Sequence, residues 1–149
     1  MKADVLDWDR ATVVLREAGL RATPARKAIL KAMYGKGPLT EEEIAARVGH
    51  HSADQATLYR NLSTLQRVGL VRRHSFSSRV LYFSLHLPGE EACEHAHFLC
   101  ESCGRCECLE DAKLTEKPFE LGGRVVKSVE VVVNGICNGC RRSRKGGKR

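Results

Sequence analysis

The chain has 149 residues and a net charge of +7 at pH 7, with 42% hydrophobic but only 5% aromatic residues. This length is enough for one compact domain or for two small ones. No apolar run approaches the roughly 20 residues of a membrane-spanning helix, and the opening MKADVLDWDR is acidic where a signal peptide would be apolar. We therefore expect a cytoplasmic protein that does not bind membranes. Disulfides are rare in that compartment, so the seven cysteines are expected to bind metal or to perform redox chemistry.

The charges are unevenly distributed along the chain. Residues 55–89 contain five arginines and no carboxylate, whereas residues 90–130 contain ten acidic and five basic groups. A segment whose charges are all basic is suited to bind an anion such as the phosphate backbone of DNA. Residues 142–149 are also rich in basic groups, and their composition predicts a disordered tail.

Three short helices are predicted in the first fifty residues, where apolar residues recur at spacings of three and four. A glycine marks the end of each helix, and the second and third helices also have a cap at the start. The helices begin near Ala11, at Thr23 with Pro24, and at Thr40 with Glu43, and they end at Gly19, Gly35 and Gly49.

The acid-free segment begins with a fourth predicted helix, for which Ser52 and Gln55 form a second capping box. Its leucines at positions 58, 62 and 65 make one apolar stripe. The candidate DNA-contacting residues lie beside or opposite that stripe and are Thr57, Tyr59, Arg60 and Arg67.

Two β-prone stretches, 70–76 and 79–85, follow around a serine-rich turn and predict a hairpin. Helices followed by a hairpin are the order of a winged helix-turn-helix. We expect the fourth helix in the major groove of a DNA duplex and the hairpin on its phosphates. A merely solvated helix face would explain the arginines, but it would not explain the missing carboxylates.

Residues 86–92, which include proline and glycine, favour a hinge. The part that follows is predicted to be mainly β, with strands near 93–97 and within 124–137 and too small a core to be stable alone. Between these strands, residues 111–123 can form at most two helical turns because Pro118 interrupts them.

Two Cys-x-x-Cys pairs form the strongest motif, Cys100 with Cys103 and Cys137 with Cys140. Four thiolates suit a closed tetrahedral zinc site. The alternative is a redox dithiol, which is expected near a βαβ pattern that this sequence lacks. Structural zinc, with an apparent binding energy of about 10–16 kcal/mol, would stabilise a half that has little core.

A second cluster of possible ligands is Cys93, His95 and His97, which a strand would place on one face. The alternative is an exposed polar strand edge with one buried cysteine. The nearby Cys106 and Cys108 favour a metal site. The remaining histidines at 50, 51 and 74 have no ligand spacing and are expected in loops or at the surface.

In this order the motifs resemble the ferric uptake regulator family over residues 8–141. The matching stretches include LREAGLRATPARKAIL, ATLYRNLSTLQRVGLV, HAHFLCESCG and GICNGC. The resemblance implies an α+β fold with an N-terminal winged helix-turn-helix (1–85), a hinge (86–92) and a small α/β metal-binding dimerisation domain (93–141). It implies a homodimeric repressor that binds a palindromic double-stranded operator when its sensing metal is bound. It also implies that Tyr59 and Arg60 approach bases or phosphates and that the four paired cysteines hold structural zinc.

The chain departs from the family pattern at its sensing site. Pro38 stands in place of a usual histidine, the strand around 81–85 lacks the usual carboxylate, and Cys108 replaces a usual Glu or Asp. The remaining set is Cys93, His95, His97 and Cys108, with Cys106 or His86 as the alternative fourth ligand. Sulfur and nitrogen donors favour a second zinc over Fe²⁺ or Mn²⁺. The chain is thus most similar to the zinc uptake regulators of this family, which control metal uptake genes.

Other functions are compatible with parts of this pattern. The same fold could instead serve an iron-responsive regulator, or a redox- or peroxide-responsive one that uses Cys93, Cys106 and Cys108 as a thiol switch. A zinc deaminase would need His-x-Glu before Pro-Cys-x-x-Cys, which the sequence lacks. We therefore expect no enzymatic activity and no small-molecule substrate.

Overall fold

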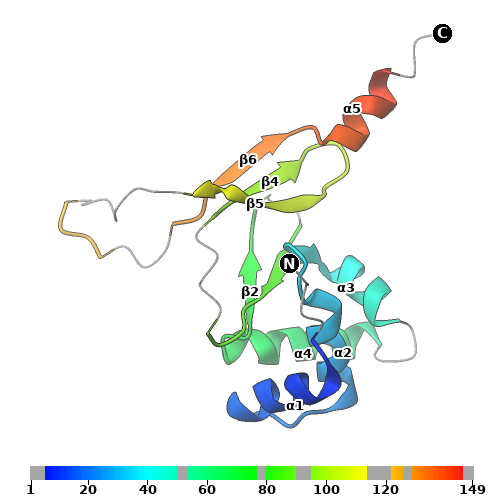
Figure 1. Cartoon of the computed structure of the whole chain (residues 1–149), viewed down its shortest axis with the longest axis vertical. Coiled ribbons are helices and arrows are strands. Elements are labelled where there is room, and N and C mark those ends of the chain that lie inside the picture. Colours follow the sequence, from blue (N-terminus) through cyan, green and yellow to red (C-terminus); the bar gives the residue numbers. More distant parts are fainter. Residues whose placement is uncertain are drawn as a thin grey trace. The chain divides into compact units, whose positions relative to one another are not determined.

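The computed structural model describes residues 6–49, 54–76, 80–89, 95–113, 122–125 and 129–145. The chain divides into two units, Met1–Glu90 and Glu91–Arg149, each with its own sheet. Both helices and strands are present, as predicted for an α+β protein (Figure 1). No helix in the described ranges is long and apolar enough to cross a membrane.

The first unit contains the four predicted helices, α1 (Trp8–Glu17), α2 (Pro24–Met33), α3 (Glu41–Val48) and α4 (Gln55–Arg67). The caps of α2 and α3 are confirmed. Thr23 accepts a hydrogen bond from the backbone of the first turn of α2, and Thr40 and Glu43 exchange both bonds of a capping box at 2.8 and 3.2 Å. These bonds satisfy N–H groups that have no partner within the helix.

The predicted cap of α4 was wrong. Its N-cap is Asp54, which has an extended backbone conformation, and its carboxylate accepts a 2.6 Å hydrogen bond from the backbone N–H of Thr57. This bond, together with the nearby Arg60, lowers the pKa of Asp54 below its usual value of 3.8. A carboxylate is favoured here because the helix dipole is positive at this end. Ser52 lies outside the described residues.

The hairpin of the first unit is confirmed as β2 (Val71–His74) paired antiparallel with β3 (Tyr82–Leu85). A two-residue strand that was not predicted, β1 (Leu39–Thr40), pairs with the other edge of β3. Two residues are too few to show strand alternation in a sequence. The helices and this sheet enclose one core of sixteen buried residues, among them the three leucines of the α4 stripe.

The second unit contains β4 (His95–Cys100), β5 (Cys106–Lys113), β6 (Val132–Gly135) and α5 (Asn138–Lys145). The sheet order is β5-β4-β6, with β4 antiparallel to β5 and parallel to β6. The strands predicted near 93–97 and within 124–137 correspond to β4 and β6. The sequence did not predict β5, because its charged residues at positions 107, 110, 111 and 113 interrupt any regular apolar alternation. Helical turns predicted from residue 111 are replaced by strand as far as Lys113, and residues 114–121 lie outside the described ranges.

Helix α5 corrects the prediction of a disordered tail from residue 142, since it continues to Lys145. The backbone N–H of Arg141 donates to the carbonyl of Cys137 at 2.9 Å, and the hydroxyl of Ser143 donates to the carbonyl of Gly139 at 3.1 Å. The turn that carries the last two cysteines therefore starts the helix, and composition alone does not show this.

Candidate metal centre and nucleic-acid interface

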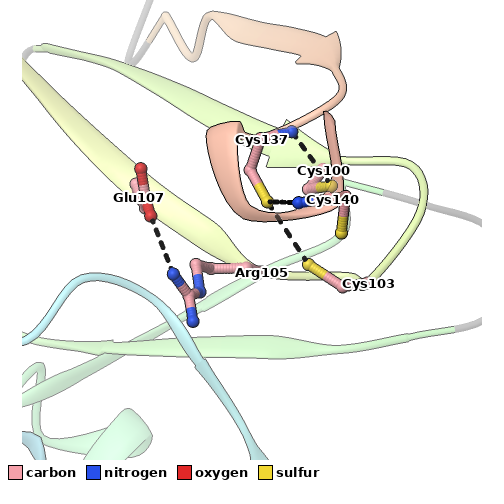
Figure 2. A network of polar contacts seen from close by, with 6 residues as sticks. All are labelled: Cys100, Cys103, Arg105, Glu107, Cys137 and Cys140. Atoms are coloured by element: carbon pink, nitrogen blue, oxygen red, sulfur yellow. Dashed lines mark hydrogen bonds and ion pairs between the residues drawn. The ribbon is translucent and has the colours of Figure 1, made fainter. Parts of the chain in front are cut away.

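The four paired cysteines converge at one end of the second unit. Cys100 ends β4, Cys103 lies in the following turn, Cys137 precedes α5, and Cys140 lies in the first turn of that helix. Their sulfur atoms all lie within 4.8 Å of one another, and Figure 2 shows the four side chains directed toward one point. None of the six cysteines in the described ranges forms a disulfide. The fold thus brings together two sequence pairs that are separated by 33 residues.

Backbone N–H groups point at the sulfur atoms of this cluster. The N–H of Cys137 donates to Sγ of Cys100 at 3.3 Å, and the N–H of Cys140 donates to Sγ of Cys137 at 3.5 Å. The first of these bonds is the main reason why the pKa of Cys100 falls to about 6, although burial opposes the change. A thiol with this pKa is largely ionised at neutral pH, and the thiolate is the form that binds metal.

The spacing of the sulfur atoms fits a tetrahedral ion. Ligands about 2.3 Å from one zinc lie about 3.8 Å apart at the corners of a tetrahedron. The Sγ atoms of Cys103 and Cys137 lie 3.8 Å apart. Gly104, with φ of +72°, closes the turn between the first pair and β5, and its N–H donates to the carbonyl of Cys100 at 2.8 Å. Four sulfur donors leave no ligand position for water, so this arrangement suits a structural metal.

One side of the cluster opens into a cavity of about 400 Å³, whose lining includes Cys103, Cys140 and Arg105. Cys103 is exposed, whereas Cys100 is buried. Arg105 forms an exposed ion pair with Glu107 at 3.7 Å beside this opening (Figure 2). Such an exposed pair contributes little to stability.

The second predicted ligand set is described only in part. His97 on β4 is buried and pairs directly across the antiparallel ladder with Cys108 on β5. Directly opposed residues in such a ladder have Cβ atoms about 4.5–5.5 Å apart and point to the same face. Cys106 lies two residues away on β5, opposite Leu99. It therefore shares the face of Cys108.

Two other members of that predicted set are less well described. The backbone of His95 begins β4, but its side chain lies outside the description, and Cys93 lies outside the described residues altogether. The alternative ligand His86 belongs to the first unit, where its Nε2 lies 3.0 Å from the hydroxyl of Ser84. Burial, then Arg72 and then His74, lower the pKa of His86 below 6.5.

His74 was predicted at the surface, and this prediction was wrong. Only 4% of His74 is exposed, its Nε2 lies 2.6 Å from the hydroxyl of Ser84, and its ring stacks on Phe76 with centroids 5.0 Å apart. Position 74 ends β2 and faces Tyr82 across the hairpin. A polar ring can be buried there because Ser84 supplies a hydrogen-bond partner.

The candidate DNA-contacting residues lie on the outer side of α4. Arg60, Arg67 and Tyr59 are exposed, and Tyr59 keeps 59% of its surface accessible, while Thr57 is half-buried. The leucine stripe turns toward the core and thereby fixes which side of the helix faces solvent. In the hairpin, Arg72 and Arg73 are exposed, and Arg79 lies outside the described residues. The first unit therefore presents a helix with a basic outer face, followed by a basic hairpin.

Comparison with known proteins identifies this combination of features. The model of the ferric uptake regulator family matches residues 17–132. The chain belongs to the ferric uptake regulator family. It is 28% identical over 138 residues to the ferric uptake regulation protein of Synechococcus elongatus, covering 87% of this chain and 91% of that protein. It is 32% identical over 115 residues to the peroxide-responsive repressor PerR of Staphylococcus aureus, covering 74% of this chain and 73% of that protein.

Solved structures of ferric uptake regulators share the fold. The Vibrio cholerae ferric uptake regulator superposes with a TM-score of 0.64 at 20% sequence identity, over 85% of this chain and 98% of that chain. The chain, as a member of this family, has an N-terminal winged-helix DNA-binding domain followed by a C-terminal dimerisation domain. As a member of this family the chain is a metal-responsive transcriptional regulator, and the family's proteins bind DNA as dimers.

Proposed function

We propose that this ferric uptake regulator family member is a zinc-responsive repressor of metal uptake genes that binds a palindromic operator as a homodimer. The observation that carries the proposal is the pairing of His97 with Cys108 across β4 and β5. An imidazole and a thiolate at adjacent positions form a nitrogen and sulfur donor set, which prefers zinc, whereas Fe²⁺ and Mn²⁺ are better served by oxygen-rich sites.

In this proposal the protein uses two zinc ions with different roles. The first is structural and is held by the four paired cysteines, a role supported by the 3.8 Å spacing of two of their sulfur atoms. The second is the sensing ion, held by Cys93, His95, His97 and Cys108. Residues 86–92 would form the hinge before these ligands, so a bound ion would restrict how the two DNA-binding domains of a dimer are spaced. Half-sites on one face of a duplex recur about every 34–36 Å, so that spacing decides whether both can dock.

The first domain, 1–85, would read the operator. Its α4 would lie in the major groove, with Tyr59 and Arg60 near base edges and with Thr57 and Arg67 on the flanking backbone. The exposed arginines of the hairpin would contact phosphates. Domain 93–141 would hold the dimer together. The protein would act in the cytoplasm.

The test measures DNA binding as a function of buffered free metal. The probe is a duplex that the zinc-loaded wild-type protein selects from a random-sequence pool. A metal that binds the DNA-competent arrangement about 100-fold better shifts its population by about 2.7 kcal/mol. Zinc is therefore expected to promote binding at low free concentration and ferrous iron to do so poorly. His97→Ala and Cys108→Ser should lose the response but remain dimers, whereas Cys106→Ser should respond normally.

Two outcomes would contradict the proposed sensing site. One is activation by ferrous iron as effective as that by zinc. The other is a normal zinc response in His97→Ala. If Cys106→Ser loses the zinc response and Cys108→Ser keeps it, the fourth ligand is Cys106, which lies on the same face of β5.

A peroxide-responsive function is the second candidate. Cys106 and Cys108 are half-buried thiols on one face of β5, and the Staphylococcus aureus relative is a peroxide-responsive repressor. In this alternative, oxidation of Cys106, Cys108 or Cys93 would release the protein from DNA. Peroxide added to the zinc-loaded complex separates the two functions. Release that Cys106→Ser and Cys108→Ser prevent would favour the thiol switch, and continued binding would favour zinc sensing.

A further inference from the structure

Arg26, near the start of α2, is hydrogen-bonded to Asn61 in the middle of α4. Its Nε–H donates to Oδ1 of Asn61 at 3.1 Å, and its Nη1–H donates to the carbonyl of Arg21 at 3.0 Å. The side-chain amide of Asn61 in turn donates to the carbonyl of Thr57 at 2.8 Å. Asn61 therefore accepts from α2 and donates within α4, and a single guanidinium spans the two helices and the loop before α2.

The Arg26 end of this link is held by its own surroundings. The backbone N–H of Arg26 donates to the hydroxyl of Thr23, the cap of α2, at 3.4 Å. The N–H of Thr23 donates to the same Arg21 carbonyl that receives the guanidinium, at 2.9 Å. Both Arg26 and Asn61 are half-buried. The guanidinium is thus attached to a capped helix end and a closed turn, and it can act as a fixed point for α4.

The buried core beside this link consists of apolar side chains. Leucines 58, 62 and 65 of α4 share one buried cluster with Ile29, Leu30 and Met33 of α2. Apolar contact is non-directional. It therefore decides which side of α4 faces the core, but it constrains the exact rotation angle of α4 about its own axis only loosely. The hydrogen bond to Asn61 is directional. At 100° per residue, Asn61 lies at the edge of the leucine stripe, next in sequence to Arg60.

We infer that Arg26 and Asn61 are positioning residues that set the rotation of α4 and thereby the register in which Tyr59 and Arg60 meet DNA. This inference rests on the proposed role of α4. A rotation of about 15° moves a point about 5–6 Å from the helix axis by roughly 1.4 Å. The donor–acceptor distance of a hydrogen bond to a base edge can vary by only about 0.5 Å. Base recognition would therefore be lost before the contacts to phosphates are lost. Arg26 and Asn61 act through α4, so their loss is expected to lower specificity more than general affinity.

The experiment compares the affinity for a selected duplex with that for a scrambled duplex of the same length. The zinc-loaded wild-type protein first selects the duplex from a random-sequence pool. Arg26→Ala and Asn61→Ala are expected to reduce the ratio of the two affinities about tenfold or more, which corresponds to losing about one base contact. Their affinity for the scrambled duplex should stay within about threefold of wild type, with an unchanged dependence on salt.

Arg10→Ala is the matched control. Arg10 also joins two helices of the first unit, because its Nη1–H donates to the hydroxyl of Tyr34 at 3.3 Å and its guanidinium lies 5.6 Å from the centre of that ring. This link does not involve α4. Arg10→Ala can be compared with Arg26→Ala when both lower the melting temperature equally. If Arg10→Ala then keeps the affinity ratio, the lower specificity of Arg26→Ala comes from a changed position of α4 and not from a general loss of stability.

Several results would overturn the inference. An unchanged ratio in folded Arg26→Ala or Asn61→Ala would do so, as would an equal loss in Arg10→Ala. Arg26→Ala could instead lower the affinity for both the selected and the scrambled duplex, with a slope of log affinity against log salt concentration that is smaller by about 0.9. That result would mean that Arg26 contacts a phosphate directly. If Arg26→Ala does not fold, Arg26→Gln and Asn61→Ala supply the same comparison. A wild-type protein that selects no sequence would refute the proposed function itself, and the inference with it.

Discussion

Replacing Cys137 with serine is expected to unfold the second unit and to leave the first unit folded. Among the described residues of the second unit, the buried apolar side chains outside the sulfur cluster are Ala96 and Leu99. Burying a leucine-sized side chain contributes about 1.5–3 kcal/mol, so these two contribute at most about 5 kcal/mol. A structural zinc contributes about 10–16 kcal/mol. A zinc bound at the four cysteines would therefore be the larger contribution, whereas the first unit has sixteen buried core residues that do not depend on it.

Cys137 is central to the sulfur cluster. Its N–H donates to Cys100, its sulfur accepts from the N–H of Cys140, and its carbonyl accepts from Arg141 at the start of α5. The assay combines metal content after mild chelation with amide hydrogen exchange. In Cys137→Ser we expect zinc to be lost and the amides of β4 and β6 to exchange rapidly, while α1–α4 stay protected. Cys106→Ser is the control and should keep both zinc and protection. A Cys137→Ser protein with one equivalent of zinc and a protected β4 would refute the reasoning.

Three further predictions concern the first unit. The side chain of Leu62 is only 1% exposed, so Leu62→Ala should reduce the free energy of unfolding by about 2–5 kcal/mol. Urea titration should show a lower midpoint, and an unchanged midpoint would contradict the burial of Leu62. Asp54→Ala should lower the melting temperature because the N–H of Thr57 loses its acceptor, whereas Ser52→Ala should not. A lower melting temperature in Ser52→Ala but not in Asp54→Ala would support the cap predicted from the sequence. His86 has a lowered pKa in the folded protein, because of burial first and then Arg72 and His74. Below pH 6.5 the unfolded chain therefore binds more protons at His86 than the folded chain does. The free energy of unfolding falls as the pH drops from 6.5 through the folded pKa, and His86 contributes no pH dependence above 6.5. His86→Gln should remove that part of the pH dependence in melting experiments at pH 5–8, and an unchanged profile would assign it to another group.

The sequence by itself determined the features that depend on residues close together in the chain. The caps of α2 and α3 join residues three apart, and the leucine stripe of α4 repeats every three or four residues. Each Cys-x-x-Cys pair is likewise a local motif. Such patterns predict candidate metal ligands and the buried side of a helix because backbone geometry alone places these side chains together.

Only the tertiary structure decided which distant residues meet. The pairing of His97 with Cys108 depends on strand register, and a shift of one residue would move Cys108 to the other face. Arg26 and Asn61 lie 35 positions apart and meet only because α2 packs on α4. Strand β5 has no apolar alternation of its own, and its pairing with β4 defines it. Local propensity does not specify these contacts, because their free energy comes from partners that folding alone brings within reach.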